Sequence, residues 1–265
     1  MLNGSGRMTK KIIFVDLDGT LINNGNRDVL QSTKDAINQA KTNGHLVVLS
    51  TGRPPMLFYG LDKQLGIDSY IACNGRYVVV DGEVIYKDSI PTNTISELVE
   101  YCKKERIDIS MQNDSEFVLQ SDYEDFYKKF SDNFNMEYPI LKPDYYKELE
   151  VYQMGLYYHK DDFEKFNELF PTLSFHFSCK YGLDVNAKGG MKELGVKKVV
   201  EHLKHKLDDT IAIGDGFNDI GMIQLAGIGV AMGNAPKEVK DSADIIARKV
   251  NEDAINHLFI ALDII

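Results

Sequence analysis

The fold is decided by the stretch Ile12-Ile13-Phe14-Val15-Asp16-Leu17-Asp18-Gly19-Thr20. Its first four residues form a short continuous apolar run, which is typical of a strand buried on both faces of a parallel sheet. Asp16 and Asp18 follow directly, so their carboxylates lie at the carboxyl end of this strand. In open α/β sheets, ligands bind outside the carboxyl ends of the strands. We therefore expect this stretch to supply both a buried strand and part of a ligand site.

Downstream of this stretch, helix and strand patterns alternate. Ser32 with Asp35 forms a weak capping box, an apolar helical face follows, and Gly44 ends the helix. Residues 46–49 repeat the buried-strand pattern, and Pro54 suits the first position of another short helix. The first part of the chain therefore predicts the order β-α-β-α.

The same alternation returns near the end of the chain. A helix is expected over about 190–205, a strand over 210–213, a helix near 219–225 and a strand over 228–231. Strands that alternate with helices predict a parallel sheet with helices on both faces. The predicted fold class is α/β, with a Rossmann-like parallel-sheet core built from two separate parts of the chain.

The middle of the chain has a different texture. Asp81-Gly82 separates two strand-like runs and predicts a hairpin, because this pair supplies the positive φ angles of a tight turn. From about residue 90 to residue 183 we expect two helix-strand-strand passages rich in Tyr and Phe. The expected strands include 116–120, 151–158 and 173–178. We therefore predict that residues 1–86 and 185–265 form the core, and that residues 87–184 form an inserted α+β cap.

Composition limits the classes of partner. The chain has 265 residues, of which 43% are hydrophobic and 26% are charged, as in ordinary globular proteins. A net charge of -10 repels a nucleic-acid backbone, and we find no Lys/Arg stripe that offsets it. There is no 18-residue apolar run and no apolar signal stretch at the start. We expect no nucleic-acid or membrane partner and a cytoplasmic location, and we expect a monomer or a weak homo-oligomer.

Three polar motifs each follow a predicted buried strand. They are Asp16-Leu17-Asp18-Gly19-Thr20, Ser50-Thr51-Gly52-Arg53 and Gly214-Asp215-Gly216-Phe217-Asn218-Asp219. Because ligands of open parallel sheets bind beyond the carboxyl ends of the strands, the three motifs point into one place.

These motifs resemble those of a known family. Asp-x-Asp-Gly-Thr, Thr-Gly-Arg and Gly-Asp-Gly-x-Asn-Asp, with a lysine before the last, are similar to the haloacid dehalogenase superfamily, and specifically to its Cof-like sugar-phosphatase branch. The resemblance covers the chain from about Lys10 to its end, and the cap matches only in position and texture. Ala247 and Ala254 replace the threonine and glycine that are frequent in this branch, outside the catalytic motifs. The resemblance implies a Mg²⁺-dependent phosphatase of small phosphorylated metabolites, sugar phosphates first of all, with an aspartyl-phosphate intermediate.

The chemistry explains the predicted catalytic residues. Asp16 is the nucleophile, because an ionised carboxylate attacks phosphorus and splits hydrolysis into two easier steps. Asp18 protonates the leaving oxygen and then activates water. Thr51 offers a hydroxyl and a backbone N–H to the transferring phosphoryl group, and Lys192 joins a helix N-terminus in holding phosphate. The predicted substrate-binding residues are Thr51, Gly52, Lys192 and Asn218.

The predicted metal site contains oxygen ligands. Asp215 resembles the metal-binding aspartate of the family, and together with Asp16 and the Asp18 carbonyl it leaves positions for water and a phosphate oxygen, which suits Mg²⁺. Asp219 completes the predicted set, although its position at a helix N-terminus suits a cap equally well. The absence of a Cys/His set from the motifs argues against zinc.

Three assignments stay open in the sequence. Lys188 lies as close to Gly189-Gly190 as Lys192 does, and alignment with the lysine-containing motif of the family favours Lys192. Arg53 is either a phosphate clamp or part of the architecture, and in this family the position more often serves the architecture. Asn218 either positions substrate or caps a helix.

Two other functions use the same fold. A phosphomutase would pass the aspartyl phosphate to another sugar hydroxyl, and a binding or regulatory protein would have lost turnover. The sequence disfavours the second, because every motif residue needed for chemistry is present. Candidate substrate contacts from the first linker and the cap are Asn74-Gly75-Arg76, Arg106, Lys180 and Tyr181.

Overall fold

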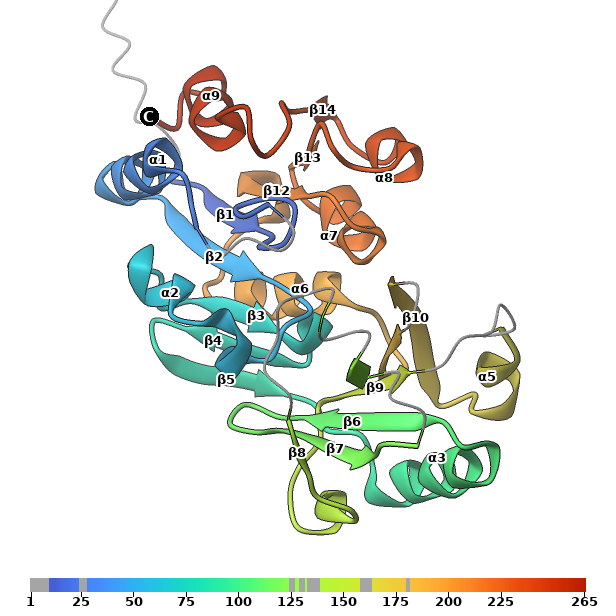
Figure 1. Ribbon diagram of the computed structural model, residues 1–265. Helices are drawn as coiled ribbons and strands as arrows, with labels where there is room; N and C mark the ends of the chain where they lie inside the picture. The colour runs from blue at the N-terminus through green and yellow to red at the C-terminus, as the bar shows by residue number, and fades with distance from the viewer. Residues whose placement is uncertain are drawn as a thin grey trace, which may run out of the picture.

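The computed structural model describes residues 10–23, 28–123, 127–128, 132, 139–157, 164–179 and 182–265. These residues form one sheet of eight strands and one sheet of six strands. Figure 1 shows the eight-stranded sheet in the upper part of the molecule and the six-stranded sheet below it. The predicted α/β class with a parallel-sheet core is confirmed.

The eight-stranded sheet has the order β14-β13-β12-β1-β2-β3-β4-β5. The strands from β14 to β3 pair in parallel, whereas β4 is antiparallel to β3 and β5 is antiparallel to β4. The bounds are β1 Ile12–Val15, β2 Leu46–Ser50, β3 Tyr70–Ala72, β4 Tyr77–Val80, β5 Glu83–Lys87, β12 Thr210–Gly214, β13 Ile228–Ala231 and β14 Ile245–Ile246. Strand β1 therefore lies inside the sheet, between β12 and β2.

Helices cover both faces of this sheet, which explains the continuous apolar run of β1. Ile12 and Phe14 pack in one core cluster with residues of α6 and α7, whereas Ile13 and Val15 pack in another with residues of α1 and α9. Burying each such side chain contributes about 1.5–3 kcal/mol. The helices are α1 Gln31–Thr42, α2 Leu61–Gln64, α6 Lys192–His202, α7 Ile220–Leu225, α8 Lys237–Asp241 and α9 Ala254–Ala261, with 3₁₀ turns at Pro55–Phe58, Cys73–Gly75, Leu207–Asp209 and Phe217–Asp219.

Two predicted helix starts are wrong. The N-cap of α1 is Leu30, so Ser32 already lies inside the first turn and makes no capping bond. The Ser32 hydroxyl instead helps to lower the pKa of Asp253, which precedes α9. Pro54 is the N-cap of the 3₁₀ turn and Pro55 occupies its first position, because the chain enters the turn one residue later than expected.

The second sheet has the order β10-β11-β9-β6-β7-β8, and only the β7–β8 pair is parallel. Its strands are β6 Asp108–Gln112, β7 Phe117–Ser121, β8 Ile140–Leu141, β9 Gln153–Tyr157, β10 Leu173–Cys179 and β11 Gly182–Ala187. The helices α3 Thr92–Glu105 and α5 Glu164–Leu169 share a core cluster with this sheet, and a 3₁₀ turn lies at Tyr145–Lys147. Apolar residues of β6, β9 and β11 alternate with polar ones, so the sheet has one apolar face and one polar face.

The chain crosses twice between the two sheets. The predicted hairpin is confirmed, since β4 and β5 pair across Asp81 and Gly82, whose φ angles are 50° and 79°. After Lys87 the chain passes to the second sheet, and it returns after Ala187, past the predicted end of the cap at residue 184. The division into core and cap stays a prediction. None of the helices in the described ranges is both long and apolar enough to cross a membrane.

Candidate active site

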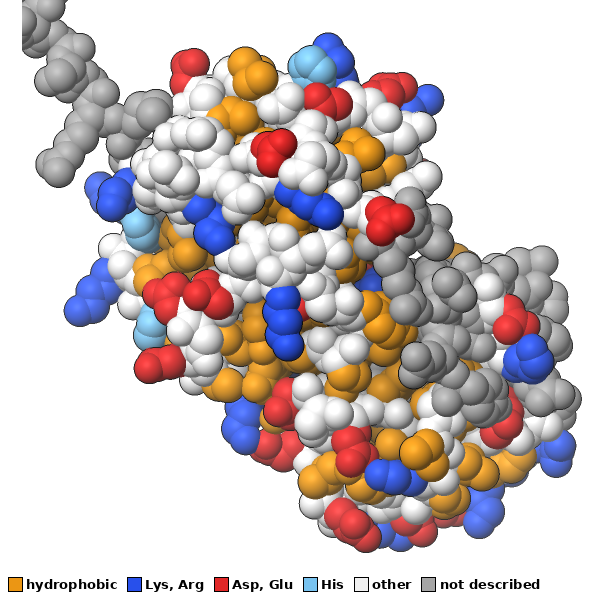
Figure 2. Space-filling model, turned by 60° about the vertical axis from the view of Figure 1, so that its left-hand side comes forward, with side chains coloured by type: hydrophobic (Ala, Val, Ile, Leu, Met, Phe, Trp, Pro, Cys, Tyr) orange, Lys and Arg blue, Asp and Glu red, His pale blue; other side chains and the backbone are white. Residues whose placement is uncertain are grey.

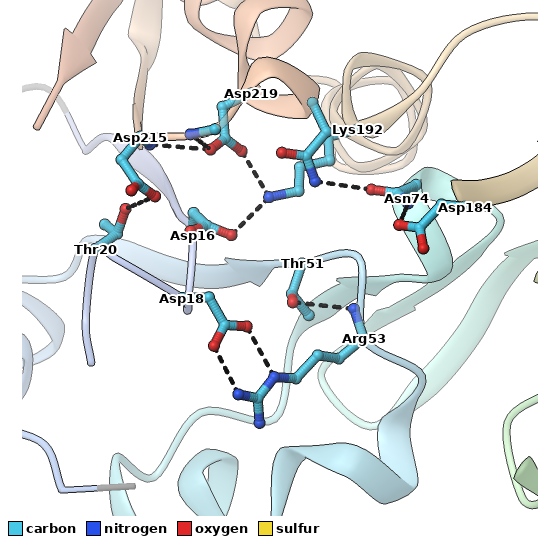
Figure 3. A network of polar contacts seen from close by, with 12 residues as sticks. Asp16, Asp18, Thr20, Thr51, Arg53, Asn74, Asp184, Lys192, Asp215 and Asp219 are labelled. Carbon is cyan, nitrogen blue, oxygen red and sulfur yellow. Dashed lines mark hydrogen bonds and ion pairs between the residues drawn. The ribbon is translucent and has the colours of Figure 1, made fainter. Parts of the chain in front are cut away.

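The three motifs meet at the carboxyl edge of the core sheet. Asp16 follows β1, Asp215 follows β12, and Thr51 follows β2, the neighbour of β1 on its other side. Lys192 is the first residue of α6, and its side chain points at Asp16 (Figure 3). The topology therefore brings together side chains that lie far apart in the sequence.

Lys192 forms the centre of a buried ionic network. Its Nζ lies 2.6 Å from a carboxylate oxygen of Asp16 and 2.6 Å from one of Asp219, and the lysine is 1% exposed. Burial raises the pKa of Asp16 well above its usual range; Lys192 opposes this rise, and neighbouring carboxylates add to it. Burial alone would lower the pKa of Lys192, but Asp16 and Asp219 outweigh it and raise that pKa. The lysine is therefore held charged against the nucleophile candidate.

Asp215 lies in a tight cradle. Its oxygens accept hydrogen bonds from Asn234 at 3.0 Å and from the Thr20 hydroxyl at 3.5 Å. Gly19 has a φ of +78°, and a Cβ on it would lie 2.1 Å from Asp215 Oδ2, so only glycine leaves room for this carboxylate. Burial, and next the charge of Asp219, raise the pKa of Asp215. Oxygens of Asp16, Asp215 and Asp219 all lie within 4.8 Å of one another.

Asp219 has both oxygens engaged. One accepts the bond from Lys192, and the other accepts backbone N–H bonds from Asp215 at 3.0 Å and Gly216 at 2.8 Å. The side chain therefore fixes the turn that carries Asp215 and anchors the lysine at the same time.

Arg53 binds the predicted acid/base residue directly. Its guanidinium donates to both oxygens of Asp18, at 2.6 and 2.8 Å, and to the carbonyl of Leu57 at 2.8 Å. The same group lies 5.8 Å from the centre of the Tyr59 ring. Figure 3 shows the Asp18 carboxylate turned toward Arg53 and away from Lys192. Arg53 therefore contributes to the architecture by holding a site residue.

One predicted feature of Thr51 is wrong. Its backbone N–H donates to the Ile71 carbonyl at 2.9 Å, because sheet pairing between β2 and β3 continues past Ser50, so this N–H is not available to a phosphoryl group. The Thr51 hydroxyl accepts a bond from the Arg53 N–H at 3.1 Å and can still donate. The next N–H, that of Gly52, has no acceptor among the described residues.

The other candidate residues differ in whether they lie at the site. Lys188 is exposed, whereas Lys192 lies in the network. Asn218 lines the cleft described below and donates to Asn74 at 3.0 Å. The Arg106 guanidinium lies 5.4 Å from the centre of the Tyr123 ring, away from the residues that line the cleft. Lys180 and Tyr181 lie outside the described residues.

A cleft of about 650 Å³ opens over these motifs. The core lines it with the Asp16, Thr51 and Asp215 motifs, and the second sheet lines it with residues of β6, β7, β9, β10 and β11. Figure 2 shows hydrophobic side chains gathered across the middle of one face, between its charged margins. The residues of the second sheet that line the cleft are Gln112, Phe117, Gln153, Tyr157, His176, Phe177 and Asp184.

Hydrogen bonds join the two sheets beside the cleft. The buried Asn74 donates to Gln153 at 2.9 Å and to Asp184 at 3.0 Å, and it accepts from Asn218. Gln153 also donates to the Gly52 carbonyl at 3.0 Å. Sequence reasoning proposed Asn74 as a possible contact but missed Gln153 and Asp184. The available signal was a polar residue at alternate positions of strands that are otherwise apolar.

Arg76 connects the two crossings of the chain. Its guanidinium donates to Asp88 at 2.5 Å in the first crossing, and to the carbonyls of Ala187 and Gly190 in the second, the latter at 2.8 Å. The side chain is buried, so it does not line the cleft as a substrate contact. Its position next to the start of α6 ties both crossings to the helix that carries Lys192.

Comparison with known proteins agrees with this geometry. A family model described as haloacid dehalogenase-like hydrolase matches residues 13–259. The chain belongs to this family. It is 34% identical over 249 residues to the putative phosphatase YkrA of Bacillus subtilis (strain 168), covering 94% of this chain and 96% of that one. Within the family, the chain is a phosphatase of the Cof-like type, as the motifs predicted.

Solved structures share the whole fold. A hypothetical protein from Geobacillus kaustophilus HTA426 has a TM-score of 0.90 at 32% identity, covering 97% of this chain and 100% of that chain. A sugar phosphatase of HAD subclass IIB has a TM-score of 0.85 at 31% identity, with the same coverage. Both sheets described above therefore occur together in related proteins.

Proposed function

We propose that this chain is a Mg²⁺-dependent phosphatase that hydrolyses small phosphorylated metabolites, sugar phosphates first of all, through an aspartyl phosphate on Asp16. The observation that carries the proposal is the position of Asp16. It is 5% exposed, lies 2.6 Å from the buried Lys192, and forms part of the wall of the cleft between the two sheets. A buried carboxylate beside a fixed cation is suited to attack a dianionic phosphoryl group.

The carboxylate cluster fits Mg²⁺. Asp16 and Asp215 offer hard oxygen ligands a few ångströms apart, and their raised pKa values reflect burial and repulsion from neighbouring carboxylates, which a divalent cation would relieve. We assign Asp16, Asp215 and the carbonyl of Asp18 as the protein ligands. Asp219 supports them, because both of its oxygens already hold Lys192 and the turn. When bound, Mg²⁺ supplies positive charge that stabilises the transferring phosphoryl oxygens.

The first chemical step uses the oxygen of Asp16 that does not face Lys192. This oxygen bonds to phosphorus while the bond from phosphorus to the leaving oxygen breaks. The Thr51 hydroxyl and the Gly52 N–H line the cleft and are available to the equatorial phosphoryl oxygens, and we propose that the remaining N–H of the buried Lys192 ammonium joins them. The reaction gives an acyl phosphate on Asp16 and a leaving alkoxide.

Asp18 carries the proton in both steps. As an acid it gives a proton to the leaving alkoxide, and as a base it takes a proton from water, which attacks phosphorus and releases inorganic phosphate from Asp16. In the present arrangement Asp18 is paired with Arg53 through both oxygens. We propose that Arg53 positions Asp18 and that Asp18 turns from it toward the leaving oxygen when a substrate is bound.

The cleft supports the proposed substrate class. Its volume of about 650 Å³ suits a small phosphorylated metabolite. Asn218 belongs to the motif that carries Asp215. It lines the cleft beside Asn74, where it can contact the leaving group. The similar solved structure that is named as a sugar phosphatase supports sugar phosphates as the first substrates to test.

The test is Mg²⁺-dependent phosphate release from p-nitrophenyl phosphate and from a panel of hexose, pentose and triose phosphates, nucleotides, flavin mononucleotide and pyridoxal phosphate. We expect turnover that chelator abolishes. Asp16→Asn keeps the size of the side chain but removes the nucleophile, so it should lower kcat by at least about 10⁴-fold. Asp208→Asn, at an exposed site, is the matched control and should keep full activity. Activity retained in Asp16→Asn would contradict the covalent mechanism.

A further inference from the structure

On the second sheet, the amide side chains that face the cleft bond mainly to one another. Gln153 donates to Gln112 at 3.2 Å and to the Gly52 carbonyl, and its own oxygen accepts from Asn74 and Asn186. The hydrogen-bonding capacity of Gln153 is therefore filled within the protein. A ligand would have to break these bonds in order to use it.

Asp184 differs from these amides. It lies on β11 next to β9, lines the cleft, and accepts a 3.0 Å bond from Asn74 at Oδ2. Its Oδ1 has no hydrogen-bond donor in the part of the chain that the structure describes. Burial raises the pKa of Asp184 to about 6, against the opposing effects of Asn74 and Lys192. A carboxylate oxygen in such surroundings gains from a donor that a ligand supplies.

A second polar group without a partner lies beside it. His176 on β10 faces Asp184 in the antiparallel pairing of β10 with β11, and it also lines the cleft. Its Nε2 is buried and makes no hydrogen bond to any described residue. Burial lowers the pKa of His176, so the imidazole is neutral at pH 7 and offers one donor and one acceptor. Two neighbouring strands thus carry unfilled hydrogen-bonding capacity beside one part of the cleft.

Aromatic rings line another part of the cleft. Phe117 and Tyr157 both line it, and Tyr127 packs edge-on against each of them, with ring centres 5.8 and 5.0 Å apart. The Tyr157 hydroxyl is bonded to Ser110 at 2.8 Å, so the hydroxyl is used within the protein. Aromatic surfaces of this kind bind the faces of flat or puckered rings.

We propose that Asp184 determines substrate specificity by accepting a hydrogen bond from a hydroxyl or N–H group on the edge of a ring-bearing leaving group. His176 is a second polar contact for that edge, and Phe117 and Tyr157 contact the ring face. The substrate class is then a phosphate monoester of a ring that carries hydrogen-bond donors, such as a sugar or a hydroxypyridine. A monoester of a plain ring would leave Asp184 unpaired and would be disfavoured. This inference rests on the proposed phosphatase function.

The test compares Asp184→Asn with the wild type. Asparagine has the same shape and can still accept from Asn74 through its one oxygen, but it turns an amide group toward the cleft in place of a charged acceptor. The probes are glucose 6-phosphate, ribose 5-phosphate and pyridoxal 5′-phosphate, which carry donors, and phenyl phosphate, which carries none. The measured quantity is the ratio of kcat/KM for each donor-bearing ester to kcat/KM for phenyl phosphate.

We expect this ratio to fall at least about tenfold for the ester that the wild type prefers, as loss of a charge-assisted hydrogen bond predicts. Asp114→Asn makes the same change at an exposed residue of the turn between β6 and β7, which does not line the cleft, and its ratio should equal that of the wild type. Asp184→Ala, which removes both carboxylate oxygens, replaces Asp184→Asn if thermal melting shows that the latter is unfolded.

Each outcome decides between the claims. An unchanged ratio in a folded, active Asp184 variant overturns the specificity role and leaves the phosphatase function intact. No turnover of any probe by the wild type, phenyl phosphate included, overturns the proposed function and this inference with it. A lower ratio in Asp184→Asn together with an unchanged ratio in Asp114→Asn supports the inference.

Discussion

The predicted core and the predicted cap hold their polar side chains in different ways. At the core edge, buried charges pair with each other, as Lys192 does with Asp16 and Asp219. On the cap face, neutral amides such as Gln153 bond to one another, and Asp184 stands apart with one oxygen to which no described residue donates. In the proposed mechanism, the core stabilises the same phosphoryl group in every reaction, whereas the cap contacts a leaving group that differs between substrates. Core substitutions should therefore lower turnover of all esters, and cap substitutions should change their ranking.

The largest effect is expected for Lys192→Met. Removal of one partner from a buried ionic network costs about 3–5 kcal/mol, because Asp16 and Asp219 remain close together without the cation. Loss of a donor to the phosphoryl oxygens should also lower kcat about 10²–10³-fold for every ester. Denaturant unfolding without metal and steady-state kinetics measure the two effects. Lys188→Met, at an exposed site, should change stability by less than about 0.5 kcal/mol, and equal effects in both variants would contradict the network.

The second-largest effect should differ between substrates with different leaving groups. Asp18→Asn removes the proton donor, so glucose 6-phosphate turnover should fall about 10²–10⁴-fold. The burst of p-nitrophenolate from p-nitrophenyl phosphate should fall much less, because this leaving group departs without protonation. Arg53→Met should lower turnover of the same esters by smaller factors, since Arg53 acts through Asp18. An equal loss for both esters in Asp18→Asn would show that Asp18 is not the acid.

A smaller effect concerns pH and stability in the metal-free protein. The folded-state pKa of Asp215 is raised above the usual unfolded value, so the folded protein binds this proton more tightly than the unfolded chain. Ionised Asp215 therefore destabilises the fold increasingly as pH rises from about 4 through the raised pKa. Asp215→Asn lacks this loss, and its stability relative to the wild type should grow by a few kcal/mol between pH 4 and pH 8, at about 1.4 kcal/mol for each unit by which the pKa is raised. Parallel stability curves in chelator would contradict this assignment.

The smallest effect is expected at the aromatic part of the cap. Phe117→Ala removes one ring contact worth about 0.5–1.5 kcal/mol, so KM for ring-bearing esters should rise a few-fold with kcat little changed. Glycerol 3-phosphate has no ring and serves as the internal control. A matching rise in KM for glycerol 3-phosphate would place the effect in the fold and not in recognition of the leaving group.

The core could be predicted from the sequence because its signals are local. Four consecutive apolar residues before Asp16 indicate burial on both faces, and the motifs at strand ends indicate where the site lies. The prediction for the Thr51 N–H was wrong because it depends on pairing between strands. The Thr51 N–H is used by Ile71, and no local pattern shows that the β2–β3 pairing extends that far. The prediction that Ser32 caps a helix was wrong because α1 begins before this residue.

The cap face could not be predicted in the same way. Gln153 and Asp184 lie on neighbouring strands only because β9 pairs with β11, and they meet Asn74 only because the two sheets pack together. Both relations are long-range, and a single sequence carries no signal for the register between distant strands. The contact of Arg53 with Asp18 is of the same kind, since 35 residues separate the two in the chain.

The central claim is that the phosphoryl group passes through Asp16, and trapping the intermediate tests it most directly. Wild-type enzyme would be mixed with Mg²⁺ and p-nitrophenyl phosphate, quenched in acid during turnover, and reduced with borohydride, which converts an aspartyl phosphate to homoserine. Peptide mass spectrometry should then find homoserine at position 16, and only when substrate is present. Turnover with an unmodified Asp16 and with the modification at another carboxylate would contradict the account.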